Sequence, residues 1–294
     1  MEQFIQQTIN GLSVGSVFAL LGLGVTMVWG VLGVLNFAHA QILTWGAFST
    51  WFALDADIPV LPAIAIGVLV GVLISVALNS TVIAALRKRN APEFAFVVAT
   101  IGVALVMEEV LREVTDAETR PFPRDGFPTG AVTIGSISIP GLQVVVLIVS
   151  VLVMIALAYW LNRTKGGRAV RTVAYNRETA ELLGINSKRV YTIAFAISGA
   201  LAAIGGVFVS VDSAAISYST GDPLLLTAFA VMILGGMGSP KGAMVGGLVL
   251  GIAQVYATVY VSSVFRQAVA MLIILAVLLV RPQGLFGEPQ SARV

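Results

Sequence analysis

No Asp, Glu, Lys or Arg occurs among the 52 residues between Glu2 and Asp55. As an α-helix this stretch would be about 78 Å long, which is enough for two crossings of a hydrocarbon core of roughly 30 Å and a turn. Asn36 and His39 interrupt the apolar run, so we expect the turn near Gly33–His39. The composition agrees, because 57% of the 294 residues are hydrophobic and only 11% are charged, against about 25% in soluble domains. A soluble enzyme, a disordered chain and a nucleic-acid-binding domain are therefore excluded.

Seven more apolar stretches follow, separated by polar residues. They are Val60–Leu86, Phe94–Leu111, Leu142–Leu161, Val190–Val211, Pro223–Leu234, Gly242–Val261 and Ala268–Val280. With the first two they predict nine membrane segments, and eight full spans plus one broken or re-entrant piece is an equally good interpretation. We expect an all-α polytopic integral membrane protein with about eight to nine transmembrane helices, one or two of them short or broken, in a single domain over residues 1–294.

The basic residues concentrate in alternate loops. Thirteen of the 17 Lys and Arg residues lie at positions 87–89, at 163–189, at Lys241 and after Val280, whereas eight of the 15 Asp and Glu residues lie in the intervening loops. Cytoplasmic loops carry the excess of Lys and Arg in membrane proteins. This pattern predicts a cytoplasmic C-terminus, and nine spans then place the N-terminus outside. Glycine pairs at four-residue spacing, Gly11/Gly15, Gly67/Gly71, Gly242/Gly246 and Gly247/Gly251, predict close helix packing or a role in gating.

The sequence offers no catalytic or metal-binding constellation. It has no cysteine and a single histidine, His39, which excludes thiolate and paired-histidine metal sites. The glycine-rich run at 235–242 fails as a phosphate loop, because Pro240 precedes Lys241 and Gly242 follows it. We therefore expect no enzyme activity and no ATP hydrolysis by this chain. Each Asp and Glu lies near the end of a predicted segment, and this pattern disfavours an ion-driven carrier.

The largest basic loop, about residues 162–190, contains a short predicted helix. Asn176 suits the N-cap, Glu178 the first turn and Gly184 the left-handed position after the last turn. Ala180, Leu183 and Ile185 would supply a small apolar face. Two interpretations remain open at this point, a helix on the membrane surface and a docking element for a cytoplasmic partner.

Four sequence blocks carry a resemblance to a known family. They are Leu35–His39; Gly167–Arg171 with Leu183–Asn186; Leu234–Ser239 with Gly242–Ala243 and Gly246–Gly247; and Arg281–Gly287. In addition, Glu178–Gly184 resembles the E-A-A-x-x-x-G loop of ABC importer permeases, with Thr179 in place of the usual small residue. The chain resembles the LivH/LivM-type permeases of branched-chain amino acid importers, and most closely the LivH branch. It has Ala40 where that family commonly has glycine.

The resemblance implies a multi-chain importer in the plasma or inner membrane. The expected partners are a second, LivM-type permease subunit, two cytoplasmic ATP-binding subunits and an external solute-binding protein; ATP binds to the partner subunits, and this chain needs no cofactor of its own. The coupling loop that docks on an ATPase would then comprise Arg168, Arg171, Asn176, Glu178, Ala180, Leu183, Gly184, Ile185 and Asn186. The cargo would be a branched-chain amino acid, or urea, an amide or another small solute; a stand-alone secondary transporter or channel is the remaining alternative.

Interrupted segments near the membrane centre are the best sequence indication of a transport pathway. The turn after the first span offers Asn36, His39, Gln41 and Thr44 as candidates, with His39 either facing the pathway or holding the turn. The short segment Pro223–Leu234 runs into the glycine block, where we expect Gly235, Gly236, Gly238, Gly242, Gly246 and Gly247 to serve gating or packing. Asp212 and Asp222 are expected on an outer loop, either as ordinary solvated charges or as contacts for the binding protein.

Overall fold

The computed structural model describes residues 2–128, 130–134, 137–262, 264 and 266–287, and most of them are helical. Six helices in this part of the chain are long and apolar enough to cross a membrane. They are α1 (Glu2–Leu32), α3 (Val60–Leu78) continued through a π-helical turn η1 (Asn79–Ile83) and α4 (Ala84–Lys88), α5 (Glu93–Val114), α6 (Gly141–Arg163), α9 (Ser187–Ser213) and α11 (Pro240–Tyr260). Every apolar segment expected from the sequence is a helix, which confirms the all-α polytopic fold.

The remaining helices are shorter. They are α2 (His39–Asp55), α7 (Lys165–Tyr175), α8 (Arg177–Leu182), α10 (Asp222–Gly235) and α12 (Arg266–Val280). The sequence predicted one or two short or broken segments, and the structure has three, α2, α10 and α12, with 17, 14 and 15 residues. A helix of 14 residues is about 21 Å long and cannot by itself cross roughly 30 Å of hydrocarbon.

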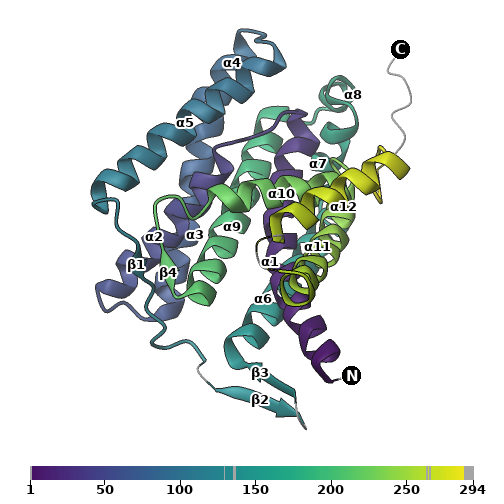
Figure 1. Cartoon of the computed structure of the whole chain (residues 1–294). Helices are drawn as coiled ribbons and strands as arrows, with labels where there is room; N and C mark the ends of the chain where they lie inside the picture. The colour runs from purple at the N-terminus through teal and green to yellow at the C-terminus, as the bar shows by residue number, and fades with distance from the viewer. Residues whose placement is uncertain (1, 129, 135–136, 263, 265, 288–294) are drawn as a thin grey trace.

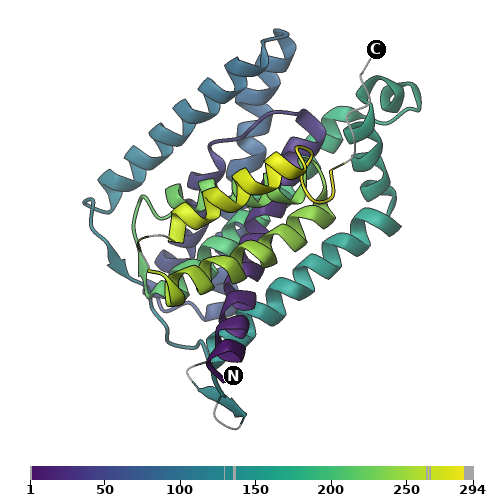
Figure 2. The same ribbon diagram turned by 45° about the vertical axis from the view of Figure 1, so that its right-hand side comes forward.

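Helix α1 forms the centre of the bundle, with α6, α9, α10 and α11 packed around it (Figures 1 and 2). Its apolar window is 83% buried, whereas that of α5 is only 17% buried, so α5 lies at the periphery. In lipid, helices associate through close packing rather than hydrophobic burial, and small residues permit that approach. The many buried glycines and alanines of α1 and α9 fit this requirement.

The predicted glycine pairs lie at helix crossings. A side chain on Gly251 of α11 would overlap the backbone of Gly15 on α1, and one on Gly11 would overlap Ile252. On the other side of the bundle, a Cβ on Gly71 of α3 would lie 2.8 Å from the carbonyl oxygen of Gly199 on α9. The predicted packing role of these residues is therefore confirmed.

The chain re-enters the bundle after α1. Helix α1 ends at Leu32, the backbone turns at Gly33, where φ is +70°, and α2 begins at His39. The His39 ring lies against Gly24, where an added Cβ would be 2.7 Å from its Cε1. Because Gly24 lies eight residues before the end of α1, α2 starts about 12 Å inside the bundle. The expected turn is thus a descending, non-helical segment.

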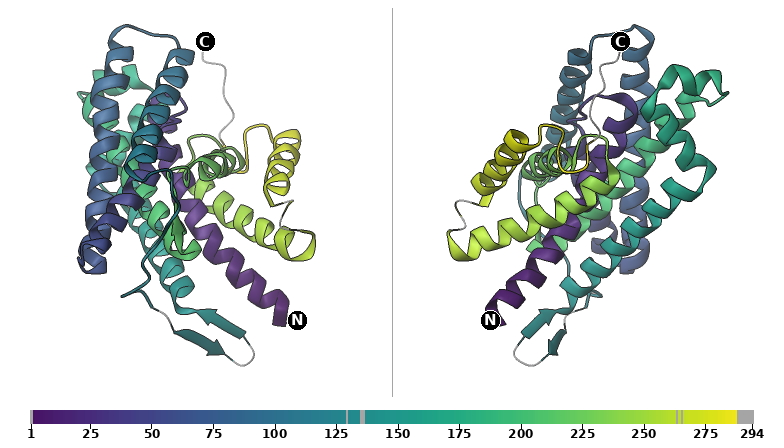
Figure 3. Two further views of the ribbon diagram at one scale, coloured as in Figure 1. Left: turned by 60° about the vertical axis from the view of Figure 1, so that its left-hand side comes forward. Right: turned by 90° about the vertical axis from the view of Figure 1, so that its right-hand side faces the viewer.

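Helix α10 runs across the long axes of α1 and α9 (Figures 1 and 3). It begins beside α2, because the Gly221 amide donates to Thr44 Oγ1 at 3.1 Å. It ends at the glycine block, where the backbone turns at Gly236 with φ of +106°. The segment is therefore a short helix with both ends held by protein groups, and its second half is largely buried from Ala228 onward.

The two ends of the bundle differ in charge. Helices α4 and α8, with the basic residues around them, lie at one end, and the start of α1 lies at the other (Figures 1 and 3). The strands lie towards that second end: β1 (Arg120–Pro121) pairs with β4 (Ala215–Ile216), and β2 (Ala131–Ile134) pairs with β3 (Ile137–Pro140), both antiparallel. This arrangement agrees with the predicted alternation of basic and acidic loops.

Replacing Gly251 by Leu should strongly destabilise the protein, because the side chain would separate α1 from α11. Overpacking of this kind costs about 3 kcal/mol. Gel filtration of heated samples of the detergent-solubilised protein measures the melting temperature. We expect this temperature to fall by more than 10 °C. Gly102→Leu is the matched control, since nothing lies within 4 Å of a Cβ at this α5 position. Equal melting temperatures for the two variants would contradict the packing role.

Candidate functional site

The basic loop folds as two helices joined at a sharp corner. Thr164 caps α7, with its Oγ1 accepting a hydrogen bond from the Gly167 amide at 3.0 Å. Gly167 itself packs onto the backbone of Trp160 and Leu161, where no side chain would fit. The first helix of the loop is therefore fixed to the end of α6. The sequence analysis did not predict α7; Thr164 three residues before the buried Gly167 is the signal that was available.

Both predicted caps of α8 are confirmed. Asn176 Oδ1 accepts from the Thr179 amide at 2.9 Å, as an N-cap does. At the other end Gly184 has φ of +78°, its amide donates to the Glu181 carbonyl, and the Ile185 amide donates to the Ala180 carbonyl, each at 3.0 Å. This pair of bonds is the Schellman arrangement that ends a helix on glycine. A six-residue helix is marginal alone, so the caps and tertiary contacts hold it.

The apolar residues of α8 do not share one face. Ala180 is completely buried and Ile185 packs against the same core cluster, but Leu183 is 70% exposed. Its neighbour Leu182 is 89% exposed. The expectation that Ala180, Leu183 and Ile185 form one apolar face is therefore wrong. The helix instead anchors inward through Ala180 and Ile185 and presents two adjacent leucines outward.

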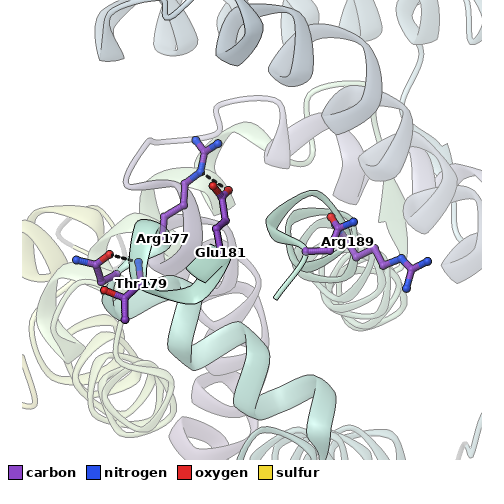
Figure 4. A network of polar contacts seen from close by, with 6 residues as sticks. Arg177, Thr179, Glu181 and Arg189 are labelled. Atoms are coloured by element: carbon purple, nitrogen blue, oxygen red, sulfur yellow. Dashed lines mark hydrogen bonds and ion pairs between the residues drawn. The ribbon is translucent and has the colours of Figure 1, made fainter. Parts of the chain in front are cut away.

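Charged residues surround the exposed leucines. Arg177 Nε and Glu181 Oε1 form an ion pair at 3.0 Å across one turn of α8 (Figure 4). The hydrogen bond from Arg177 lowers the pKa of Glu181, and the same bond raises the pKa of Arg177. Asn186 Oδ1 accepts from the Arg189 amide at 3.2 Å and so caps α9. The other predicted loop residues with charge, Arg168, Arg171 and Glu178, are all exposed.

The four predicted pathway residues are buried within the subunit. Their exposures are 3% for Asn36, 1% for His39, 1% for Gln41 and 0% for Thr44. Asn36 Oδ1 accepts from the Ala38 amide at 3.2 Å, and His39 Nδ1 lies 3.3 Å from Ser198 Oγ on α9. Thr44 accepts from Gly221, as described above. These contacts hold the descending turn and join it to α9 and α10; whether any of the four lines a pathway stays a prediction.

The glycine block packs against the C-terminal motif. The Leu285 and Phe286 amides donate to the carbonyls of Leu234 and Gly235, each at 2.9 Å. A side chain on Gly284 would overlap the backbone of Gly236, one on Gly236 would overlap the backbone of Gly287, and Gly235 lies in the same way against Gly242. Gly246 approaches Val231 and Gly235, Gly247 approaches Ala19 of α1, and Gly238 has φ of +83° beside Trp29 and Gly30. The structure thus gives each of these glycines a packing contact or a turn.

A cavity of about 440 Å³ lies beside α10, between α1, α6, α9 and α11. Its wall is mainly apolar, with Val17, Phe18 and Phe208 among the lining side chains, and it includes the amides of Gln143 and Gln254. On α10, Pro223, Leu224 and Thr227 face this cavity. A few polar groups in an apolar wall are typical of sites for small organic molecules.

Asp222 is the residue that the sequence analysis placed wrongly. It does not lie on an outer loop, because Gln41 Nε2 of the buried α2 start donates to its Oδ1 at 3.3 Å. Helix α5, which carries Glu108, lies beside α2 at this level, because Trp45 Nε1 donates to the Met107 carbonyl at 3.1 Å. The available signal was the position of Asp222 directly before Pro223, at the start of an apolar segment too short to cross.

Long apolar helices, a capped loop at the basic end and interrupted central segments define a multi-pass membrane protein. A family model described as the permease component of the branched-chain amino acid transport system matches residues 7–281. The chain belongs to this family.

Three relatives illustrate the match. The high-affinity branched-chain amino acid transport system permease protein BraD of Pseudomonas aeruginosa is 30% identical over 99% of this chain and 98% of its own length. The LivH protein of Escherichia coli K12, with the same description, is 32% identical over the same shares. The probable LivH of Methanocaldococcus jannaschii is 26% identical over 92% of this chain and 89% of its own. The resemblance seen in the sequence is therefore confirmed along nearly the whole chain.

Replacing Asn176 by Ala should loosen α8, because the Thr179 amide loses its acceptor. The cost is about 1 kcal/mol. Hydrogen exchange of the Thr179 amide, measured by mass spectrometry on the α8 peptide, should become about five-fold faster. Asn176→Asp retains an acceptor oxygen and is the matched control, and unchanged exchange in the alanine variant would contradict the capping role.

Proposed function

We propose that this chain is the translocation subunit of an ATP-driven importer in the cell membrane, and that its cargo is a branched-chain amino acid. The observation that carries the proposal is the family match over residues 7–281, together with relatives of that description along nearly the full length. The basic end of the bundle, with α4 and α8, faces the cytoplasm in this proposal, because Lys and Arg favour that side. The same rule places the C-terminus on the cytoplasmic side in this proposal.

Helix α8 is the docking element for a separate ATPase subunit. Two adjacent leucines, Leu182 and Leu183, are exposed on a helix that is anchored and capped, which is the arrangement of a rigid contact surface. Burying such a side chain against a partner contributes about 2 kcal/mol. Exposed Arg168 and Arg171 on α7 and Glu178 on α8 add charge around the leucines. A preorganised helix loses little conformational freedom on docking, which favours binding.

The partners of this chain are a second permease of related sequence, two cytoplasmic ATP-binding subunits and an external solute-binding protein. The chain itself needs no cofactor, and ATP binds to the partners. A push on α8 reaches α6 through the Thr164 corner and reaches α9 through Asn186. Helix α9 in turn contacts the His39 turn through Ser198. The proposed coupling route therefore runs through residues that are already in contact.

The apolar cavity beside α10 supports the proposed cargo. A branched aliphatic side chain fits a wall formed largely of valine, leucine and phenylalanine, and the neighbouring amides suit the polar end of an amino acid.

The double variant Leu182→Ser with Leu183→Ser should lose the ATPase. Removing two apolar contacts weakens docking by about 4 kcal/mol, roughly a thousand-fold in affinity. Co-purification of the ATPase with this chain from detergent extracts measures the effect. The pair Leu182→Met with Leu183→Met keeps the apolar surface and should retain the ATPase; full co-purification of the serine variant would count against docking through α8.

Reconstitution tests the whole proposal. Liposomes that contain this chain alone should show no leucine flux, whereas the complete importer with its binding protein should accumulate leucine only when ATP is supplied. Steady leucine flux through the chain alone would instead identify a stand-alone carrier or channel. A complete importer that accumulates another solute and ignores leucine would overturn the proposed cargo.

A further inference from the structure

Three elements bring oxygen atoms together at the start of α10. Gln41 from α2 donates through Nε2 to Asp222 Oδ1 at 3.3 Å. Glu108 from α5 interacts electrostatically with Asp222. Helix α5 is held beside α2 at this level, because Trp45 Nε1 donates to the Met107 carbonyl at 3.1 Å. The packing of the protein thus places the Asp222 carboxylate on a buried amide and brings α5, which carries Glu108, to the same level.

These groups lie deep in the bundle. Helices α3 and α4 form one span over Val60–Lys88, whose middle is near residue 74. At that middle, Ser75 Oγ donates to the Phe195 carbonyl of α9 at 2.6 Å, and three residues further along α9 Ser198 contacts His39. Gln41 is two residues beyond His39, about 3 Å along α2. Asp222, bonded to Gln41, is therefore far from both ends of the bundle.

The site carries an excess of negative charge. Within the described residues, neither Asp222 nor Glu108 takes part in an ion pair; the nearby Arg112 pairs with Glu109 at 3.4 Å. Asp222 also occupies the first turn of α10. Asp222 and Glu108 are therefore two carboxylates without an ion pair among the described residues. An ionisable group at this depth belongs on a water-filled cavity or an interface rather than in lipid, and Asp222 is exposed on the subunit surface.

A second observation indicates a ligand. Gln41 is 1% exposed, and in the part of the chain described its Oε1 has no hydrogen-bond partner. A buried polar atom without a partner is costly, and a donor group that binds beside it would remove that cost. The amide nitrogen of the same side chain is bonded to Asp222, so the free oxygen lies next to the carboxylate.

We propose that Asp222, Glu108 and Gln41 form a binding site for one positively charged group, the α-ammonium of the amino acid being transported. An ammonium has N–H donors for the two carboxylates and for Gln41 Oε1. A divalent metal ion fits less well, because Ca²⁺ takes six to eight oxygen ligands, and the described residues contain no group of three or more His, Cys, Asp or Glu side chains placed to hold a metal ion. The inference rests on the proposed function for the identity of the cargo.

The charge of the site is measured with a cysteine reporter. The chain has no cysteine, so Leu226→Cys provides a single thiol in this subunit, one helical turn from Asp222 and on a side chain 46% exposed in the native protein. Membranes with the complete importer are treated with one of two methanethiosulfonate reagents, a cationic one with a trimethylammonium group or an anionic one with a sulfonate group. Labelling of this chain is followed by mass spectrometry. Normalised to a free thiol, the cation should react at least about ten-fold faster than the anion.

Asp222→Asn and Glu108→Gln, each combined with the reporter, should lower this ratio several-fold, and together they should bring it to that of a free thiol. Glu109→Gln is the matched control, since Glu109 is adjacent on α5 but is paired with Arg112 and exposed; it should leave the ratio nearly unchanged. A ratio insensitive to Asp222 and Glu108 would overturn the site. Elution of each variant in gel filtration separates this result from misfolding.

Leucine uptake by the complete importer gives the second measurement. Asp222→Asn should lower the uptake rate at least about ten-fold, Asp222→Glu should restore part of it, and Glu109→Gln should leave it unchanged. Uptake at the full rate in Asp222→Asn would overturn the ammonium site. Two results together would assign the site to an inorganic cation instead. Leucine uptake would disappear when Na⁺ and K⁺ are replaced by N-methylglucamine, and either ion would slow the labelling of the reporter thiol by the cationic reagent. Absence of leucine uptake in the unmodified importer is failure of the proposed function, and the labelling ratio then still reports on the charge of the site.

Discussion

Backbone polar groups inside a bilayer have no water to bind, and this constraint governs the non-helical parts of the fold. The descending segment 33–38 and the approach to α10 lie within the bundle, where their amides find protein partners. Phe37 donates to Thr100 Oγ1 at 3.3 Å, Ala38 donates to Asn36 Oδ1, and Gly221 donates to Thr44 Oγ1. The polar residues of the central turns therefore stabilise the backbone there, whether or not they contact the cargo.

The same constraint explains the distribution of glycine. Helices in lipid gain stability from close contact, so the core helix α1 meets α11 along Gly11, Gly15, Gly247 and Gly251 with almost no side-chain volume between them. At the basic end, by contrast, glycine acts through its backbone conformation, as at Gly184, where the left-handed turn ends α8. Glycine thus permits close helix packing in the centre of the bundle and a left-handed turn in the basic loop.

Features fixed by local sequence were predictable. Length and hydropathy located every membrane segment, and the caps of α8 followed from Asn176 and Gly184, because capping depends only on residues within the same turn. Features fixed by tertiary contact were not predictable. The outward orientation of Leu183 depends on how Ala180 meets the core, and the depth of Asp222 depends on α2 starting inside the bundle. Neither the re-entry depth nor the crossing direction of α10 is encoded in a single segment, so Asp222 was assigned to an outer loop from its neighbours in sequence alone.

The contacts also separate a rigid part of the subunit from a part suited to movement. Separating α1 from α11 would open a continuous seam in which backbones touch, and the loss of packing would extend over several turns. The junction of α10 with α2 is different, since Gly221 with Thr44 and Gln41 with Asp222 contribute two hydrogen bonds there, each with a net value of about 1 kcal/mol. Displacement of α10 against α2 is therefore much less costly than opening the glycine seam. Helix α9 packs against α2, one of the two partners in this junction. In the proposed coupling route, a push on α8 would therefore reach a junction held by two hydrogen bonds.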